Sequence, residues 1–125
     1  MTFEYAPAPE SRAIVSIKPK YGHFIDGKFV NGRNHFATIN PATEEVLSQI
    51  ALGNASDVDK AVFAAQKAYT KTWSKLSGKE RGKYLYRIAR ILQERAREFA
   101  VLETLDNGKP IRETRDIDIP LVAAH

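Results

Sequence analysis

The stretch "SGKERGKYLYRIARILQERAREFAVLETLDNGKP", residues 77–110, decides the fold because its apolar side chains recur at helical spacing. Ser77 and Glu80, three residues apart, form a capping box, which predicts that a helix begins here. The apolar stripe lies on one face of this helix and consists of Leu85, Ile88, Ala89, Leu92, Ala96, Phe99 and Ala100. The helix is predicted to end at Gly108, which can adopt a left-handed conformation, with Pro110 just past the stop.

A second amphipathic pattern precedes this one and begins at Ser56. The Ser56 hydroxyl can cap a helix, and Asp57 and Asp59 suit the positive end of the helix dipole. Apolar spacing then continues along one face through Val58, Ala61, Val62, Ala65, Ala68, Tyr69 and Trp73. Two long amphipathic helices need an apolar surface to pack against, because their own polar faces cannot cover the stripes.

Before the helices, the sequence is typical of short strands joined by turns. "FIDGKFV" (24–30) predicts a β-hairpin, because Asp-Gly supplies the positive φ angles of a two-residue turn. Residues 36–39 and 46–52 predict two further strands that are antiparallel to each other, and residues 13–17 predict a short strand if a partner pairs with it. Residues 1–21 as a whole are expected to form an extended, flexible N-terminal arm.

After Pro110, the segment Ile111–Asp118 predicts the start of a third helix, with Pro120 in a bend or first turn. Residues 121–125 keep their apolar, helix-forming character without a stop signal, so we expect a truncated chain. Strands followed by helices are typical of an α+β domain or of the opening of a larger α/β domain. The apolar helix faces favour the α/β class, locally α+β.

The composition excludes several classes of protein. The 125 residues are 43% hydrophobic and 27% charged, which is typical of one globular domain. There is no cysteine, which excludes disulfides, thiolate metal sites and a cysteine nucleophile from this chain. No apolar run is long enough to cross a membrane and no secretory signal is recognisable, so a cytoplasmic location is the default expectation.

The net charge of +4 permits nucleic-acid binding but does not require it. Basic side chains are concentrated on the 77–108 helix, at Lys79, Arg81, Lys83, Arg87, Arg90, Arg95 and Arg97. Glu80, Glu94 and Glu98 interrupt this run, and Arg90 with Glu94 is predicted to form an i,i+4 pair. The pattern favours a solvated, salt-bridged face over a nucleic-acid-binding surface.

The sequence contains no recognisable catalytic or metal-binding motif. His23, His35 and His125 stand in no catalytic spacing with Ser or Thr and are interpreted as turn and surface histidines. Asp116 and Asp118 are two residues apart, so on a helix they point to different faces. No glycine-rich phosphate-binding pattern occurs either, so no cofactor site is expected within this chain.

The position of Asp106, close to the predicted end of the helix, is not explained by helix-capping or helix-dipole preferences. A carboxylate near a helix C-terminus faces the negative end of the helix dipole, which is mildly unfavourable. Two interpretations are open. The side chain accepts hydrogen bonds from backbone amides of the following turn, or it joins the carbonyl oxygens of the helix end in binding a hard cation.

Five segments form a collinear set along the chain: "FIDGKFV" (24–30), "INPATEEVLSQIA" (39–51), "ASDVDKAVFAAQKAY" (55–69), "ERGKYLYRIARILQERAREFAVLETLDNGKP" (80–110) and "IRETRDIDIPLVAAH" (111–125). Together they resemble the N-terminal portion of an NAD(P)-dependent aldehyde dehydrogenase. The resemblance implies that residues 22–125 are the first, incomplete part of a Rossmann-like cofactor-binding domain. Its helices would pack against a parallel sheet formed by later sequence.

The resemblance also implies an activity, the oxidation of an aldehyde to a carboxylic acid with NAD or NADP. In that family a cysteine thiolate attacks the aldehyde, hydride passes to the cofactor, and a glutamate activates water. Neither these groups nor the cofactor-phosphate loop can be assigned here, so the 125-residue chain alone is expected to be inactive and to bind no cofactor. The implied partners are the remainder of the dehydrogenase chain and the other subunits of a homo-oligomer.

A partial site for a monovalent cation, K⁺ or Na⁺, follows from the same resemblance. Some members of the family bind such a cation in this region. The match places Asp106 at that site, together with the backbone oxygens of Thr38 and Ile39. A further protein ligand would come from sequence outside this chain.

Two other functions are open as alternatives. A stand-alone interaction or regulatory module would use the exposed faces of the amphipathic helices to bind a partner or a second copy. A basic nucleic-acid-binding helix protein is the other alternative. Without a later sheet, we expect the apolar stripes to be partly exposed and the chain to self-associate or to be marginally stable.

Overall fold

The computed structural model describes residues 11–125, in which the strands come first and the helices follow, as predicted. The strands are β1 (Lys20–Tyr21), β2 (His23–Ile25), β3 (Lys28–Val30), β4 (Asn34–Ile39) and β5 (Val46–Leu52). The helices are α1 (Ala55–Lys71), α2 (Gly78–Glu94), α3 (Ala96–Asn107), α4 (Ile111–Glu113) and α5 (Ile119–Ala124). Short 3-10 helices cover Arg12–Ile14 and Trp73–Lys75, and a π-helical turn covers Thr114–Asp118.

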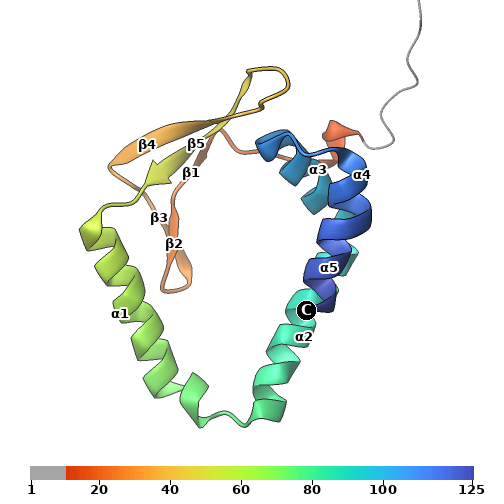
Figure 1. The fold of residues 1–125 in the computed structure, drawn as a ribbon. Helices are drawn as coiled ribbons and strands as arrows, with labels where there is room; N and C mark the ends of the chain where they lie inside the picture. Colours follow the sequence, from red (N-terminus) through yellow and green to blue (C-terminus); the bar gives the residue numbers. More distant parts are fainter. Residues whose placement is uncertain (1–10) are drawn as a thin grey trace, which may run out of the picture.

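β5 is the central strand of a three-stranded sheet with the order β1-β5-β4 (Figure 1). β4 pairs antiparallel with β5, with Asn34 opposite Leu52, which confirms the predicted pairing. β1 runs parallel to β5 along its other side. β2 and β3 form the predicted hairpin, and Asp26 and Gly27 close it with φ angles of 52° and 77°.

The last residues of the predicted N-terminal arm belong to the sheet. Arg12–Ile14 forms a 3-10 helix, so the short strand predicted at residues 13–17 is wrong. The strand forms instead at Lys20–Tyr21, where β5 supplies the pairing. Because β5 comes later in the chain, local sequence could not place this strand. Residues 1–10 of the predicted arm lie outside the described residues.

α1 is capped by Asn54 and not by Ser56, so the predicted helix start is wrong. The Asn54 side chain accepts a hydrogen bond from the Asp57 amide at 3.1 Å, and the Asp57 carboxylate accepts one from the Asn54 amide at 3.2 Å. These two bonds form a complete capping box. Ser56 lies inside the first turn, where its hydroxyl is not at the capping position.

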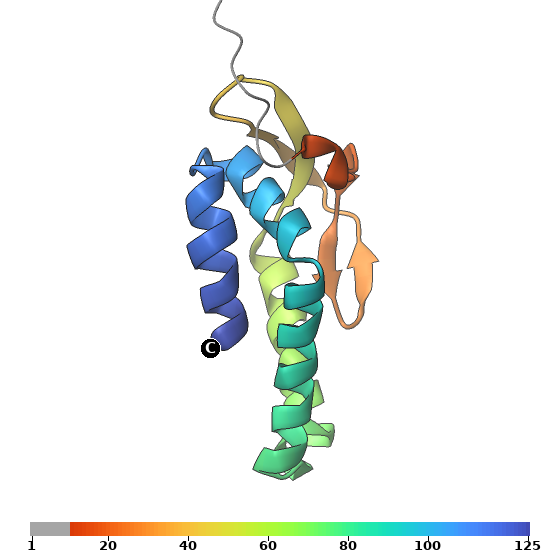
Figure 2. The same ribbon diagram turned by 90° about the vertical axis from the view of Figure 1, so that its right-hand side faces the viewer.

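The long helix predicted for residues 77–108 is interrupted at Arg95. Ser77 and Glu80 cap the start of α2, and Gly108 ends α3 with a φ angle of 78°, so both predicted ends are confirmed. Between them, Arg95 has φ −109° and ψ 20°, and Figure 2 shows that the chain changes direction there. Neither proline nor glycine stands at this break, so the local sequence did not indicate it.

From Ile111 to Ala124 the chain is helical throughout, which confirms the predicted third helix. α4 leads into the π-helical turn, and Pro120 lies in the first turn of α5. α5 runs beside α2 in both views (Figures 1 and 2).

The apolar core of the described residues is small and is contributed by β5, α3 and α5. Its buried side chains are Ala51, Ala100, Val101 and Ile119. α1 and α2, which the structure describes in full, contain no buried residue, and Phe63 and Leu85 are 69% and 62% exposed. In Figure 1 these two helices diverge from the turn that joins them. The prediction that their apolar stripes are exposed is therefore confirmed.

Candidate functional site

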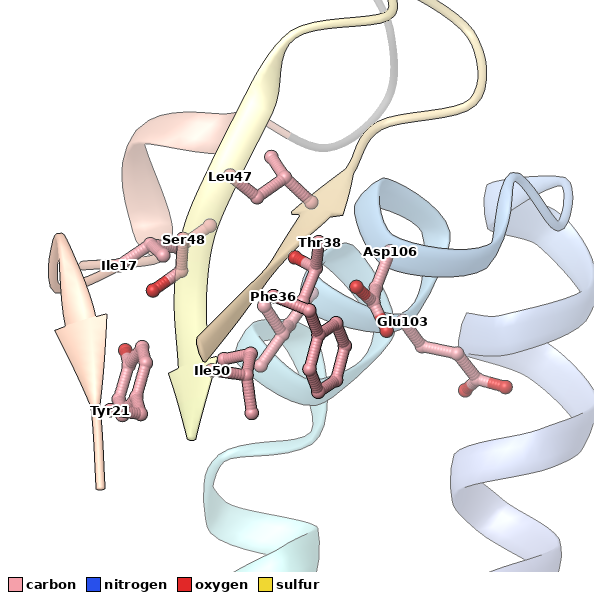
Figure 3. A pocket seen from close by; sticks show the side chains of 10 residues that line it. Ile17, Tyr21, Phe36, Thr38, Leu47, Ser48, Ile50, Glu103 and Asp106 are labelled. Carbon is pink, nitrogen blue, oxygen red and sulfur yellow. The ribbon is translucent and has the colours of Figure 1, made fainter. Parts of the chain in front are cut away.

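A pocket of about 510 Å³ opens between the sheet and α3. Figure 3 shows side chains of β4 and β5 on one side of it and side chains of α3 on the other. The lining consists of Ile17, Tyr21, Phe36, Thr38, Leu47, Ser48, Ile50, Leu102, Glu103 and Asp106. Thr38 and Asp106, two of the residues predicted to contribute to a cation site, both line this pocket, whereas Ile39 is not among its lining residues.

A tight turn after β4 lies against the end of α3. Asn40 is buried in this turn, and its amide donates a hydrogen bond to the Glu45 carbonyl at 2.9 Å. The turn packs on the end of α3, where a Cβ added to Gly108 would lie 2.7 Å from Pro41 Cγ. Sequence reasoning missed this contact, since it joins two turns that lie far apart in the chain and carry no shared pattern.

The turn-capping interpretation of Asp106 is not the arrangement that the structure adopts. The side-chain oxygen of Asn107 accepts the Lys109 amide at 2.7 Å, so the neighbour of Asp106 caps this turn. Between Thr38 and Ile39 the register of β4 on β5 shifts, and such a bulge leaves backbone groups without a ladder partner. One carboxylate and backbone oxygens are ligands that a hard cation accepts, so the donor set fits such an ion in part.

His23 and His35 are half-buried on β2 and β4, so their interpretation as turn and surface histidines is wrong. The Nε2 atom of each is buried without a hydrogen-bond partner among the described residues. His23 Nε2 lies 3.7 Å from the Asp57 carboxylate. Burial lowers the pKa of His35 from its ordinary value, and the nearby charges of Lys20 and His23 lower it further. The neutral form of His35 is therefore favoured.

Basic side chains of α2 and α3 take part in hydrogen bonds along the helix surface. Arg95 and the Glu98 carboxylate approach to 2.6 Å, which raises the pKa of Arg95 and lowers that of Glu98. Arg90 donates to the Gln93 side chain at 3.1 Å, so the predicted pair with Glu94 is not the one that forms. These contacts agree with a solvated, salt-bridged face.

Two features are absent from residues 11–125. No group of three or more His, Asp or Glu side chains comes together in a way that could hold a metal ion. Within the same residues, every helix is too short or too polar to cross a bilayer. A monovalent-cation site built mainly from backbone oxygens needs only one carboxylate. The lack of a cluster of three such side chains therefore does not argue against Asp106 as a cation ligand.

The sequence model of the aldehyde dehydrogenase family matches residues 29–125. The chain therefore belongs to the aldehyde dehydrogenase family, a family of oxidoreductases. This confirms the resemblance found in the sequence. It also confirms the α/β fold class, because solved structures of aldehyde dehydrogenases match the arrangement of strands and helices described here.

Individual relatives show the same likeness. The chain is 48% identical over 105 residues to DhaS of Bacillus subtilis (strain 168), which is provisionally named an aldehyde dehydrogenase; the match covers 82% of this chain and 21% of DhaS. It is 38% identical over 124 residues to an acetaldehyde dehydrogenase of Pseudomonas aeruginosa, covering 97% of this chain and 24% of that protein. An aldehyde dehydrogenase of Bacillus cereus, solved as an NAD⁺ complex, superposes with a TM-score of 0.77 at 38% identity, covering 81% of this chain and 21% of that one.

The extent of these matches adds two facts. The chain spans about a fifth of the length of the relatives it matches, at 21% and 24% of the two curated proteins. The Pseudomonas match covers 97% of this chain, so it extends into residues 1–21, where the sequence motifs did not reach.

Proposed function

We propose that this chain is the first part of the cofactor-binding domain of an NAD(P)-dependent aldehyde dehydrogenase that oxidises an aldehyde to a carboxylic acid. The observation that carries the proposal is the family match over residues 29–125, in which strands and helices follow one another as in the solved relatives. In this proposal residues 22–125 belong to the domain together with β1 (Lys20–Tyr21), which pairs with β5, and the residues before β1 form an arm that precedes it.

The role of the chain in that enzyme is structural support for the cofactor site. The apolar faces of α1 and α2 contain no buried residue, and they would pack against the parallel sheet contributed by the remainder of the enzyme. NAD or NADP, when bound, accepts hydride from the substrate. NAD⁺ appears in the complex of the Bacillus cereus relative, which supports a nicotinamide cofactor for the whole protein. The whole enzyme is proposed to be a homo-oligomer.

The 125 residues contain no cysteine, so the family's thiolate nucleophile has to come from elsewhere in the enzyme. The test compares the 125-residue chain with the protein expressed from its whole reading frame. Both are mixed with NAD⁺ or NADP⁺ and a panel of aliphatic and aromatic aldehydes, and absorbance of the reduced cofactor is followed. We expect reduction by the whole protein only. Turnover by the 125-residue chain of verified mass, or none by the whole protein with any aldehyde, would contradict the proposal.

We also propose that Asp106 and the backbone oxygens of Thr38 and Ile39 contribute to a site for K⁺ or Na⁺ in the whole protein. Thr38 and Asp106 line one pocket, and the register of β4 on β5 shifts at Thr38–Ile39, which supports a donor set of this kind. Asp106→Asn keeps the shape of the side chain and removes its charge. Glu103→Gln is the matched control, because Glu103 lines the same pocket.

The measurement for the cation proposal is the melting temperature of the whole protein in KCl or NaCl compared with choline chloride at the same ionic strength. We expect K⁺ or Na⁺ to raise the melting temperature of the wild type and of Glu103→Gln but not of Asp106→Asn. An equal response of all three proteins would rule out Asp106 as a ligand.

A further inference from the structure

The helical segment Ile111–Ala124 contains one wide turn. Across Thr114–Asp118 the backbone is π-helical, and the Ile119 amide donates to the Thr114 carbonyl, five residues earlier. Both ends of this turn continue directly into α-helix, α4 before it and α5 after it. π turns inside α-helices are uncommon, and each calls for a physical cause.

Two side chains account for the wide turn. Pro120 has no amide hydrogen, so it cannot donate to the Asp116 carbonyl, and its ring would collide with that carbonyl in a regular α-helix. The Thr114 hydroxyl donates to the Ile111 carbonyl at 3.2 Å, which satisfies an acceptor of the preceding turn. Thr104 on α3 lies 3.0 Å away from the same hydroxyl and serves as the donor to it.

The wide turn decides which side chains of this segment are buried. Thr114 and Ile119 are five residues apart, and they are 0% and 8% exposed. In a regular α-helix five residues advance by about 140° beyond one full turn, so the two side chains would not share a face. The π turn brings both to the same side, where the turn packs on α3 and α5 packs on α2 and α3.

Lys109 connects the wide turn to the end of α3 through an ion pair and a hydrogen bond. Its amide is held by the Asn107 side chain at 2.7 Å, and its ammonium group forms an ion pair with Asp118, the last residue of the wide turn. Both side chains are largely shielded, at 35% and 23% exposure. The hydrogen bond to Asp118 raises the pKa of Lys109, so the lysine stays charged throughout the neutral range.

We propose that Thr114–Asp118 is a joint that sets the rotation of α5 against α2, and that the Lys109–Asp118 ion pair locks it. Pro120 and Thr114 widen the turn, and Lys109 ties its far end to α3. The rotation decides which α5 side chains face the groove between α2 and α5, a space of about 440 Å³. That groove is lined by Leu85, Tyr86, Ile88, Ala89, Leu92, Val122, Ala123, Ala124 and His125.

The test uses the whole protein and two variants with opposite expected effects. Pro120→Ala restores the missing amide hydrogen, so crystallography should show a regular α-helix across Thr114–Asp118. α5 should then be rotated about its axis by about 100°, the rotation per residue of an α-helix. Backbone amide exchange of peptides from residues 111–124 should become slower in this variant. Lys109→Met removes the lock, so exchange of the same peptides should become faster by about two- to fivefold.

Two controls separate the joint from a general loss of stability. Lys71→Met removes an exposed positive charge at the end of α1 and should leave exchange of residues 111–124 unchanged. Lys109→Arg keeps the charge and should restore most of the protection that Lys109→Met loses. The proposal is overturned if the wide turn persists in Pro120→Ala, or if Lys71→Met and Lys109→Met accelerate exchange equally.

Discussion

Gly108 shows how one residue serves both local and long-range structure. Its φ angle of 78° is the left-handed conformation that ends α3, and the sequence predicted this from Asn-Gly followed by proline. The absence of a side chain also lets Pro41 approach, since an added Cβ would lie 2.7 Å from Pro41 Cγ. The second role was not predictable, because it depends on where the turn after β4 lies in space.

Gly108→Ala is therefore expected to destabilise the protein more than Gly27→Ala. Both residues have positive φ, at 78° and 77°, but a Cβ at Gly27 would meet no atom within 4 Å. We expect a loss of about 1 kcal/mol for Gly27→Ala and about 2–3 kcal/mol for Gly108→Ala, which adds the clash with Pro41. Urea unfolding of both variants measures the difference. Equal losses would show that the contact with Pro41 relaxes at no cost.

At the scale of elements, two substitutions test which residue, Asn54 or Ser56, caps the start of α1. Asn54→Ala removes the acceptor of the Asp57 amide and should lower the free energy of unfolding by about 1 kcal/mol. Ser56→Ala removes a hydroxyl from inside the first turn and should have little effect. Chemical unfolding of the two variants side by side gives the comparison. A larger loss for Ser56→Ala would restore the prediction made from the sequence.

The capping box of α2 links stability to pH. The Ser77 amide donates to the Glu80 carboxylate at 2.8 Å, and this bond, helped by the Ser77 hydroxyl, lowers the pKa of Glu80 below its ordinary value of 4.5. Because the pKa is lower in the folded state, the stabilisation is present above about pH 4.5 and is lost as the pH falls further.

Glu80→Gln keeps hydrogen-bonding groups at this position and removes the titration. We expect the variant to lose less stability than the wild type between pH 5 and pH 3, as measured by urea midpoints at each pH. Parallel loss in both proteins would mean that the Glu80 carboxylate makes no pH-dependent contribution to folding.

The break between α2 and α3 has no counterpart in local sequence. The apolar stripe continues through Arg95, and helix-forming residues surround it. α3 nevertheless buries Ala100 and Val101 in the core, whereas α2 buries nothing. α3 therefore packs against the core and α2 does not. This difference in packing is a reason for the change of direction between them, and the spacing of apolar residues along the sequence could not predict it.

At the scale of the whole molecule, the exposed apolar faces predict self-association of the 125-residue chain. Leu85 on α2 is 62% exposed and Phe63 on α1 is 69% exposed, beyond what isolated surface side chains account for. Sedimentation velocity across about a tenfold to hundredfold range of concentration should show mass increasing with concentration. Leu85→Glu should raise the monomer fraction, whereas Lys83→Glu, at an exposed polar position of the same helix, should change it much less. A concentration-independent monomer would contradict the prediction.

The sequence by itself determined the elements whose signals are local. The Asp26–Gly27 hairpin, the Ser77–Glu80 cap, the Gly108 stop and the strand at Val46–Leu52 were all predictable, because each depends on side chains a few residues apart. The collinear order of the motifs was enough to recognise the family, which the match to residues 29–125 confirmed.

The tertiary structure alone decided the features that depend on distant partners. β1 forms at Lys20–Tyr21 because β5 lies beside it, the turn at Pro41 packs on Gly108, and Thr38 lines the same pocket as Asp106 although the two lie far apart in the chain. The wide turn at Thr114–Asp118 also has contacts of this kind, to the Thr104 hydroxyl of α3 and to Lys109. Periodicity and capping signals describe neighbours along the chain, whereas these contacts join segments that meet only once the chain has folded.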